Sequence, residues 1–340
     1  MNVRDSFWKV APFVLRHAML AVALITLALP TAAQDKVWRV GLLSAGSERL
    51  EGGGRQSWRT GVLLSLGNSG YHVGKNLELV SRYAGGNVDR LPDLARQIAA
   101  ADVDVVIAVG DGSVRAMLQA SKATPIVMVV GADPVAAGFV ASLARPGGRV
   151  TGLNLQTFEG DVKRLQLLHE AMPNARRLGF LRPPGPVPAR AVDLLAGAAR
   201  QLGIELTTRA VDQLDKTAYQ AAFAGMIAEG AVGVLVASTQ ILASDLHRFG
   251  SIAQGLGLPT ICEWDHMARS GCTMAYGHDL DYAQRRSGEY AARILKGVPP
   301  ADLPVEQPDA WKLTVNLSAA AAVSLVVPAA VLARVHEVIE

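Results

Sequence analysis

Short runs of apolar and β-branched residues recur from Trp38 onward, and each is followed by a longer stretch whose apolar positions repeat with helical spacing. The runs predict strands, which fall into two series. The first series is Trp38–Leu43, Leu77–Tyr83, Val103–Val109, Ile126–Val130 and Val150–Leu155, and the second is Leu178–Arg182, Glu205–Val211, Val232–Ala237, Pro259–Glu263 and Thr273–Gly277. The stretches between them predict helices, for example over Asp89–Ala100, Gly160–Met172 and Asp281–Leu295.

The predicted strands are apolar on both faces, a pattern typical of parallel strands buried between two layers of helices. Two such series indicate two doubly wound α/β lobes rather than one very large sheet. A further extended run, Lys312–Asn316, and a last helical region follow the second series. We therefore predict an α/β protein with two Rossmann-like lobes, each built on a parallel sheet.

Residues 1–33 have the order of a secretory signal peptide. Arg4, Lys9 and Arg16 precede the unbroken apolar run Ala18–Leu29, and small residues follow up to Ala33. A membrane anchor is the alternative interpretation, but a span needs about 20 apolar residues and this run has about a dozen. We expect cleavage after Ala33 and export to the periplasm.

The composition excludes several classes of protein. The 33 Lys and Arg residues nearly balance the 30 Asp and Glu residues, and only 5% of residues are aromatic. This composition favours neither a basic face that would bind phosphates nor a set of aromatic side chains on which bases would stack. We therefore expect no nucleic-acid partner. The two cysteines, Cys262 and Cys272, are too few for a disulfide scaffold or a four-thiolate zinc site. In an oxidising compartment they could form one bridge, and two unpaired buried thiols are the alternative.

The residues that directly follow the predicted strands are mostly small and polar. In open parallel sheets, ligands bind beyond the carboxyl ends of the strands, where helix N-termini offer free N–H groups. We therefore expect a small polar ligand between the two lobes. The candidate ligand-binding residues are Ser44, Ala45, Gly110, Asp111, Ser113, Asp133, Asn154, Thr239, Glu263, Tyr276 and Gly277.

Several of these positions also have a purely local interpretation. Asp111 or Ser113 could cap the following helix, and Thr239 could form a turn. Asp133 followed by Pro134 is typical of a helix N-cap with proline at the first helical position. A capping carboxylate can still face a ligand, so both interpretations stay open.

The same residues suggest how the two ends of a ligand would be held. N–H groups at the Ser44 or Gly110 helix starts, with Ser113 assisting, would bind a ligand carboxylate. A carboxylate side chain would accept charge-assisted hydrogen bonds from a ligand amine. The candidates for that second role are Asp111, Asp133 and Glu263. An amino acid or another small amine is therefore the expected ligand.

Sequence signatures of catalysis and of cofactor binding are missing. The chain has no Gly-x-Ser-x-Gly, no phosphate loop that ends in Gly-Lys-Ser/Thr and no His-Glu-x-x-His. Nor does Gly-x-Gly-x-x-Gly follow the first predicted strand. We expect a binding protein with no catalytic residue, metal or cofactor. An exported hydrolase that uses Asp111 and Glu263 as paired carboxylates is an alternative.

Several short motifs are spread over the chain, including a Leu-Ala-Arg-Pro-Gly-Gly run. They are Gly70–Leu77, Asp89–Ala95, Asp133–Val135, Ser142–Leu153, Lys163–Leu165, Ile294–Gly297, Asp302–Pro308 and Val315–Leu317. Together they resemble the substrate-binding proteins of ABC importers, in the branch that includes tryptophan- and tyrosine-binding members. The resemblance implies a protein that delivers a small-molecule ligand to an ABC permease in the inner membrane with its ATPase. We expect the protein to be a monomer. A periplasmic sensor that signals to a membrane partner is the alternative.

The resemblance also implies a type 1 periplasmic-binding fold in which three segments join the lobes. The crossings would lie near Asn154, near Tyr276–Gly277 and near Trp311–Lys312. The N-terminal lobe would contain residues 37–153 and 277–310, and the C-terminal lobe residues 154–276 and 311–340. Asp111 and Glu263 depart from the pattern of the family, because small or hydroxyl residues are expected there.

Overall fold

The computed structural model describes residues 36–48, 58–183, 189–211, 214–239, 242 and 246–340. The predicted signal peptide lies outside the described residues, so its cleavage stays a prediction. Within the described part of the chain, no helix combines the length and the apolar character that a membrane span requires. The elements below belong to one compact unit, Trp38–Glu340.

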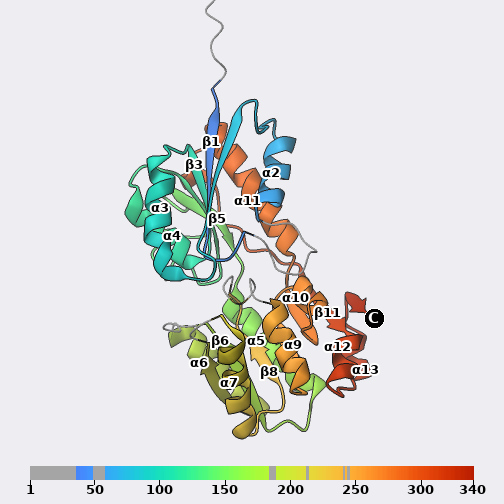
Figure 1. The fold of residues 1–340 in the computed structure, drawn as a ribbon. Helices are drawn as coiled ribbons and strands as arrows, with labels where there is room; N and C mark the ends of the chain where they lie inside the picture. The colour runs from blue at the N-terminus through green and yellow to red at the C-terminus, as the bar shows by residue number, and fades with distance from the viewer. Residues whose placement is uncertain (1–35, 49–57, 184–188, 212–213, 240–241, 243–245) are drawn as a thin grey trace, which may run out of the picture. The chain divides into compact units, whose positions relative to one another are not determined.

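The first sheet is parallel throughout, with the strand order β2-β1-β3-β4-β5. Its strands are β1 (Trp38–Ser44), β2 (Leu77–Tyr83), β3 (Val105–Val109), β4 (Ile126–Val130) and β5 (Val150–Asn154). Figure 1 shows helices on both faces: α3 (Leu91–Ala100) and α4 (Asp111–Ala120) on one, α2 (Trp58–Asn68) and α11 (Leu280–Leu295) on the other. Every residue of β3 and β4 is buried, which explains why these strands are apolar throughout.

The second sheet has the strand order β12-β11-β10-β9-β8-β6-β7. Its strands are β6 (Arg177–Arg182), β7 (Glu205–Ala210), β8 (Val234–Val236), β9 (Thr260–Cys262), β10 (Met274–His278), β11 (Trp311–Asn316) and β12 (Glu337–Ile339). The helices of this part are α5 (Thr157–Ala171), α6 (Ala189–Leu202), α7 (Lys216–Ala228), α9 (Leu246–Gly255), α10 (Asp265–Arg269), α12 (Leu317–Ala322) and α13 (Ala329–Leu332). Helix α5 packs on α6 and on the central strands β8, β9 and β10.

The predicted fold class, two α/β lobes with parallel sheets, is confirmed. Two strands run against the others in the second sheet, because β11 pairs with β10 in the antiparallel direction and β12 is parallel to β11. No helix packed on the second sheet connects β10 with β11: the chain passes through α11, which packs on α2 beside the first sheet. The chain therefore re-enters the second sheet at the end where it left, with Trp311 beside His278, which makes β11 antiparallel to β10.

Three connections run between the two sheets: from β5 to α5, from β10 to α11, and from α11 to β11. Hydrogen bonds tie them together. The Asn154 N–H donates to the Glu306 carbonyl oxygen (2.8 Å), and the Glu306 N–H donates to the Gly152 carbonyl oxygen (2.9 Å). The Lys312 ammonium donates to the Asp279 carboxylate (2.7 Å). The lobe boundaries stated above stay a prediction.

A disulfide joins Cys262 and Cys272, which the sequence left either bridged or unpaired. Cys262 ends β9 and Cys272 lies between α10 and β10, with a Cα–Cα distance of 6.3 Å. Both residues are buried, so the bond closes the turn around α10 inside the core.

Loss of this disulfide is expected to lower the free energy of unfolding by about 2–3 kcal/mol, because a short loop gains conformational freedom in the unfolded chain. Urea unfolding with and without a reductant measures the effect. The double variant Cys262→Ala, Cys272→Ala is the control and should not respond to the reductant. Equal midpoints for the oxidised and reduced wild type would contradict the prediction.

Candidate functional site

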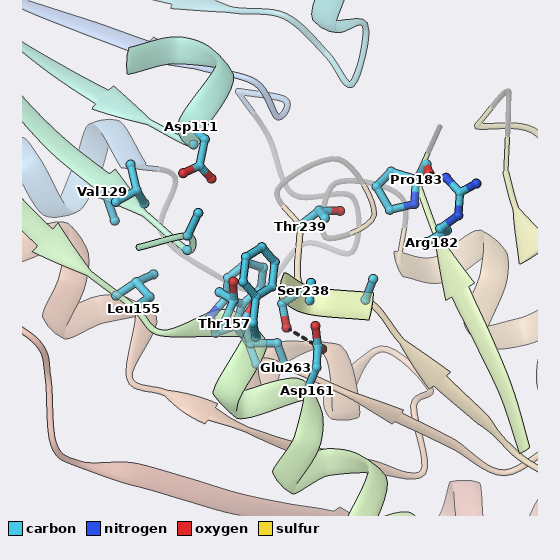
Figure 2. Close-up of a pocket in the computed structure, with 18 of the residues that line it drawn as sticks. Asp111, Val129, Leu155, Thr157, Asp161, Arg182, Pro183, Ser238, Thr239 and Glu263 are labelled. Atoms are coloured by element: carbon cyan, nitrogen blue, oxygen red, sulfur yellow. Dashed lines mark hydrogen bonds between the residues drawn. The ribbon is translucent and has the colours of Figure 1, made fainter. Parts of the chain in front are cut away.

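A pocket of about 440 Å³ is lined by residues that belong to both sheets and their helices. On the first-sheet side the lining follows β3 and β4, and on the second-sheet side it comes from α5 and from the ends of β6, β8 and β9 (Figure 2). The polar and charged lining residues are Asp111, Arg115, Thr157, Asp161, Arg182, Ser238, Thr239 and Glu263. The pocket therefore lies at the carboxyl ends of parallel strands, where ligands bind in such sheets.

The first-sheet side of the pocket is the start of α4. Gly110 is its N-cap residue, with φ at 91°, a conformation that favours glycine. The Gly110 N–H donates to the Val129 carbonyl oxygen (2.8 Å), which fixes the helix start to β4. Burial raises the pKa of Asp111, and backbone N–H groups and the Arg115 guanidinium oppose this.

The second-sheet side contains a buried ion pair on α5. The Arg164 side chain is fully buried and donates to the Asp161 carboxylate (2.8 Å). It also donates to the carbonyl oxygens of Tyr276 (2.6 Å) and Thr157 (3.2 Å) and to the Ser238 hydroxyl. Ser238 in turn donates to Asp161 (3.2 Å), as Figure 2 shows. This network connects α5 with the ends of β8 and β10.

Glu263 lies beside this network at the end of β9. Its side chain is 2% exposed, and neither carboxylate oxygen has a hydrogen-bond partner among the described residues. Burial raises the pKa of Glu263 to about 7, although the Arg164 guanidinium opposes the shift. Gly277 on β10 makes room for this side chain, because a Cβ there would lie 2.8 Å from the Glu263 Cγ.

The pocket also has an apolar part. Phe158, Phe180 and Trp264 contribute aromatic rings to its lining. Trp264 is 2% exposed and stacks on His266, with 5.8 Å between ring centroids and an interplanar angle of 11°. Rings held in this way form a wall against which an apolar or aromatic ligand group can pack.

Four of the residues predicted from the strand ends line the pocket: Gly110, Asp111, Thr239 and Glu263. The Thr239 hydroxyl also accepts a hydrogen bond from the Leu242 N–H (3.2 Å), so its turn-forming role is present as well. Ligand contact by these residues stays a prediction.

The other predicted residues are not part of this lining. Ser44 and Asn154 accept hydrogen bonds from the N–H groups two residues further on, and Ala45 is buried. Ser113 is buried in the first turn of α4. The Tyr276 ring stacks on Trp311, with 5.2 Å between centroids. Ligand roles for Ser44, Ala45, Ser113, Asp133, Asn154, Tyr276 and Gly277 stay predictions.

Strand-end reasoning missed the contribution of α5. Thr157, Phe158 and Asp161 line the pocket, and Arg164 holds Asp161 in place. One signal was available in the sequence: Asp161 and Arg164 are opposite charges three positions apart on a predicted helix, a spacing that forms ion pairs.

Two α/β lobes and a pocket lined from both sheets are the arrangement found in periplasmic binding proteins. The sequence matches the family described as ABC transporter substrate binding protein over residues 47–339. The chain therefore belongs to this family.

Individual relatives agree with this assignment. The chain is 25% identical to the tyrosine-binding protein of Clostridioides difficile over 260 residues, which are 76% of this chain and 74% of that protein. It is 28% identical to a conserved domain protein from Vibrio cholerae, with a TM-score of 0.79 over 89% of this chain and 100% of the other. A Streptococcus ABC domain in complex with L-Trp shares the fold, at 21% identity, a TM-score of 0.76 and coverage of 89% and 99%.

Proposed function

We propose that this chain is the periplasmic component of an ABC importer, which captures an amino acid or a related small amine and delivers it to an inner-membrane permease. The observation that carries the proposal is the pocket lined from both sheets, because one ligand can then contact both lobes at once. Such a ligand stabilises the closed conformation, in which both lobes contact it, and so increases the closed fraction of the protein. A permease that recognises this state would receive loaded protein only.

The dimensions and the lining of the pocket support an amino-acid ligand. A volume of about 440 Å³ lies within the range of sites for small molecules. The rings of Phe158, Phe180 and Trp264 suit an apolar or aromatic side chain. The tyrosine-binding relative and the L-Trp complex support the same ligand class.

The ligand carboxylate would bind at the start of α4. Free N–H groups of the first helical turn and the positive end of the helix dipole favour an anion there. Arg115, one turn further along α4, also lines the pocket and adds a positive charge. The network around Arg164 is neutralised by Asp161 and is therefore a weaker candidate for this end of the ligand.

We expect at least one amino acid, with aromatic ones the first to test, to bind one-to-one with a Kd in the micromolar range or tighter. Isothermal titration of protein that native mass spectrometry shows to be free of ligand measures this. The variant Ala132→Trp fills the pocket and should weaken binding more than about tenfold. Ala123→Trp, at an exposed position, should have no effect.

The outcomes separate this proposal from the alternatives. No heat from any amino acid contradicts the ligand class. Chemical change of the ligand during incubation favours the hydrolase, and full recovery of the ligand favours a binding protein. Normal uptake of the ligand in a strain that lacks this chain contradicts the importer role and favours a sensor.

A further inference from the structure

Asp133 is one of three carboxylates considered above as partners for a ligand amine. Its negative charge is already compensated by backbone N–H groups and by an arginine. Its carboxylate accepts hydrogen bonds from the N–H groups of Val135 (2.9 Å) and Ala136 (3.2 Å). It also faces the Arg190 guanidinium at 3.6 Å. Asp133 is not among the residues that line the pocket. It therefore caps the turn that begins at Pro134; the helix that the Asp133-Pro134 pair predicted is not formed, because the described chain runs through turns over 134–138.

Asp111 lines the pocket, but its charge is partly matched as well. One carboxylate oxygen is buried without a partner among the described residues. Backbone N–H groups of Gly131 and Ala132 and the Arg115 guanidinium stabilise the charged form. Asp111 thus has groups nearby that favour its charged form, although burial raises its pKa.

Among the described residues, Glu263 receives no backbone N–H group, and only the Arg164 charge and the Ser238 hydroxyl favour its charged form. Both of its oxygens are buried and unpartnered within the described chain, although a buried carboxylate without a donor is costly. Arg164, the cation that acts on Glu263, directs its two terminal NH2 groups to Asp161 and to the carbonyl oxygens of Tyr276 and Thr157, and makes no hydrogen bond to Glu263 among the described residues. The charges of Asp161 and Arg164 cancel each other. An ionised Glu263 would therefore leave this group of three side chains with one uncompensated negative charge.

We propose that Glu263 is the residue that selects ligands with an ammonium group, and that the ammonium displaces a proton from Glu263 as it binds. This rests on the function proposed above. Below about pH 7 the free protein holds mainly a neutral Glu263 carboxyl group. On binding, the O–H bond breaks, the proton passes to the solvent, and the carboxylate accepts hydrogen bonds from the ligand N–H groups. Charge is balanced because one cation enters the pocket and one proton leaves.

The charged groups around Glu263 support this exchange. Burial raises its pKa to about 7, Asp161 on α5 adds to the shift, and Arg164 and the Ser238 hydroxyl oppose it. On the neighbouring strand β10, burial lowers the pKa of His278. That ring is therefore neutral and adds no charge at neutral pH. The other titratable groups of the described pocket lining are Asp111, Arg115 and Arg182, and Tyr276 on β10 and Asp265 and His266 on α10 lie on the adjoining elements.

The sign of the pH dependence follows from linkage. The ligand ammonium stabilises the carboxylate form, so the pKa of Glu263 falls on binding and a proton is released. The affinity should level off near pH 8 and should fall about tenfold between pH 8 and pH 6. Proton release should be about half a proton per ligand at pH 7, rising toward one at lower pH.

Isothermal titration with L-tryptophan in two buffers of different ionisation enthalpy measures the released proton. If another amino acid from the panel binds more tightly, it replaces L-tryptophan. Glu263→Gln is expected to abolish proton release and to weaken binding at pH 8 at least about tenfold. Indole-3-propionate, which lacks the ammonium group, should bind Glu263→Gln no more weakly than the wild type, and should release no proton from either.

Two control variants make the test specific. Asp133→Asn should leave proton release unchanged, because that carboxylate is already paired outside the pocket. Asp111→Asn should also retain it. Loss of proton release in Asp111→Asn, or binding by Glu263→Gln with unchanged affinity and pH dependence, would overturn the assignment of Glu263. In either case an amino acid still binds, whereas no binding by any amino acid would contradict the proposed function itself.

Discussion

Replacing Arg164 with methionine is expected to lower the free energy of unfolding by about 3–5 kcal/mol, the effect of breaking a buried ion pair from one side. Methionine keeps much of the volume but leaves Asp161 buried without its cation. It also leaves the carbonyl oxygens of Tyr276 and Thr157 without their donors. Urea unfolding monitored by circular dichroism measures the loss.

Two further variants show whether the loss comes from the unpaired charge. Arg96→Met removes the same charge from a pair with Asp93 whose side chains are 67% and 68% exposed, and should cost under about 1 kcal/mol. Adding Asp161→Asn to Arg164→Met should recover part of the stability, because no ionised group remains buried. A loss below 1 kcal/mol in Arg164→Met would show that the network adds little to the fold.

The strands could be predicted because burial on both faces demands apolar residues at every position. The runs in β3 and β4 are fully buried, and the sequence pattern located both. The direction of β11 could not be predicted, since a run of apolar residues does not encode the direction of pairing. The strand β12, Glu337–Ile339, is short and lacks a fully buried residue, so it carries no such pattern.

The site could be predicted only in part, for a related reason. Strand ends locate residues such as Asp111 and Glu263, because parallel strands deliver their carboxyl ends to one edge. Asp161 and Arg164 lie inside a helix, where a charge normally marks the solvent face. Here the two charges neutralise each other and are buried together, which only the packing of α5 against the second sheet shows.

The ligand-free variant Glu263→Gln is expected to gain stability relative to the wild type as the pH rises. The difference between their free energies of unfolding should be up to about 3 kcal/mol more favourable to the variant at pH 8 than at pH 4.5. In the unfolded chain the pKa of Glu263 returns to its ordinary value of 4.5, whereas in the fold it is about 7. The native state therefore binds the proton more tightly. The free energy of unfolding of the wild type falls as the pH rises from 4.5 to 7, by about 1.4 kcal/mol per unit of pKa difference. A neutral glutamine is not subject to this loss.

Urea unfolding of the ligand-free wild type and of ligand-free Glu263→Gln at pH 4.5 and pH 8 gives the difference between their free energies of unfolding at each pH. Glu78→Gln, at a side chain that is 54% exposed, is the control and should shift stability by less than about 1 kcal/mol at either pH. Saturating amino acid should reverse the order at pH 8, because the ligand ammonium stabilises the wild-type carboxylate and gains little from the amide. A difference between wild type and Glu263→Gln that does not change with pH would mean that the ligand-free protein holds Glu263 in its ionised form. Because burial makes ionised Glu263 costly in the empty pocket, a ligand that brings a positive charge is the one that stabilises the carboxylate.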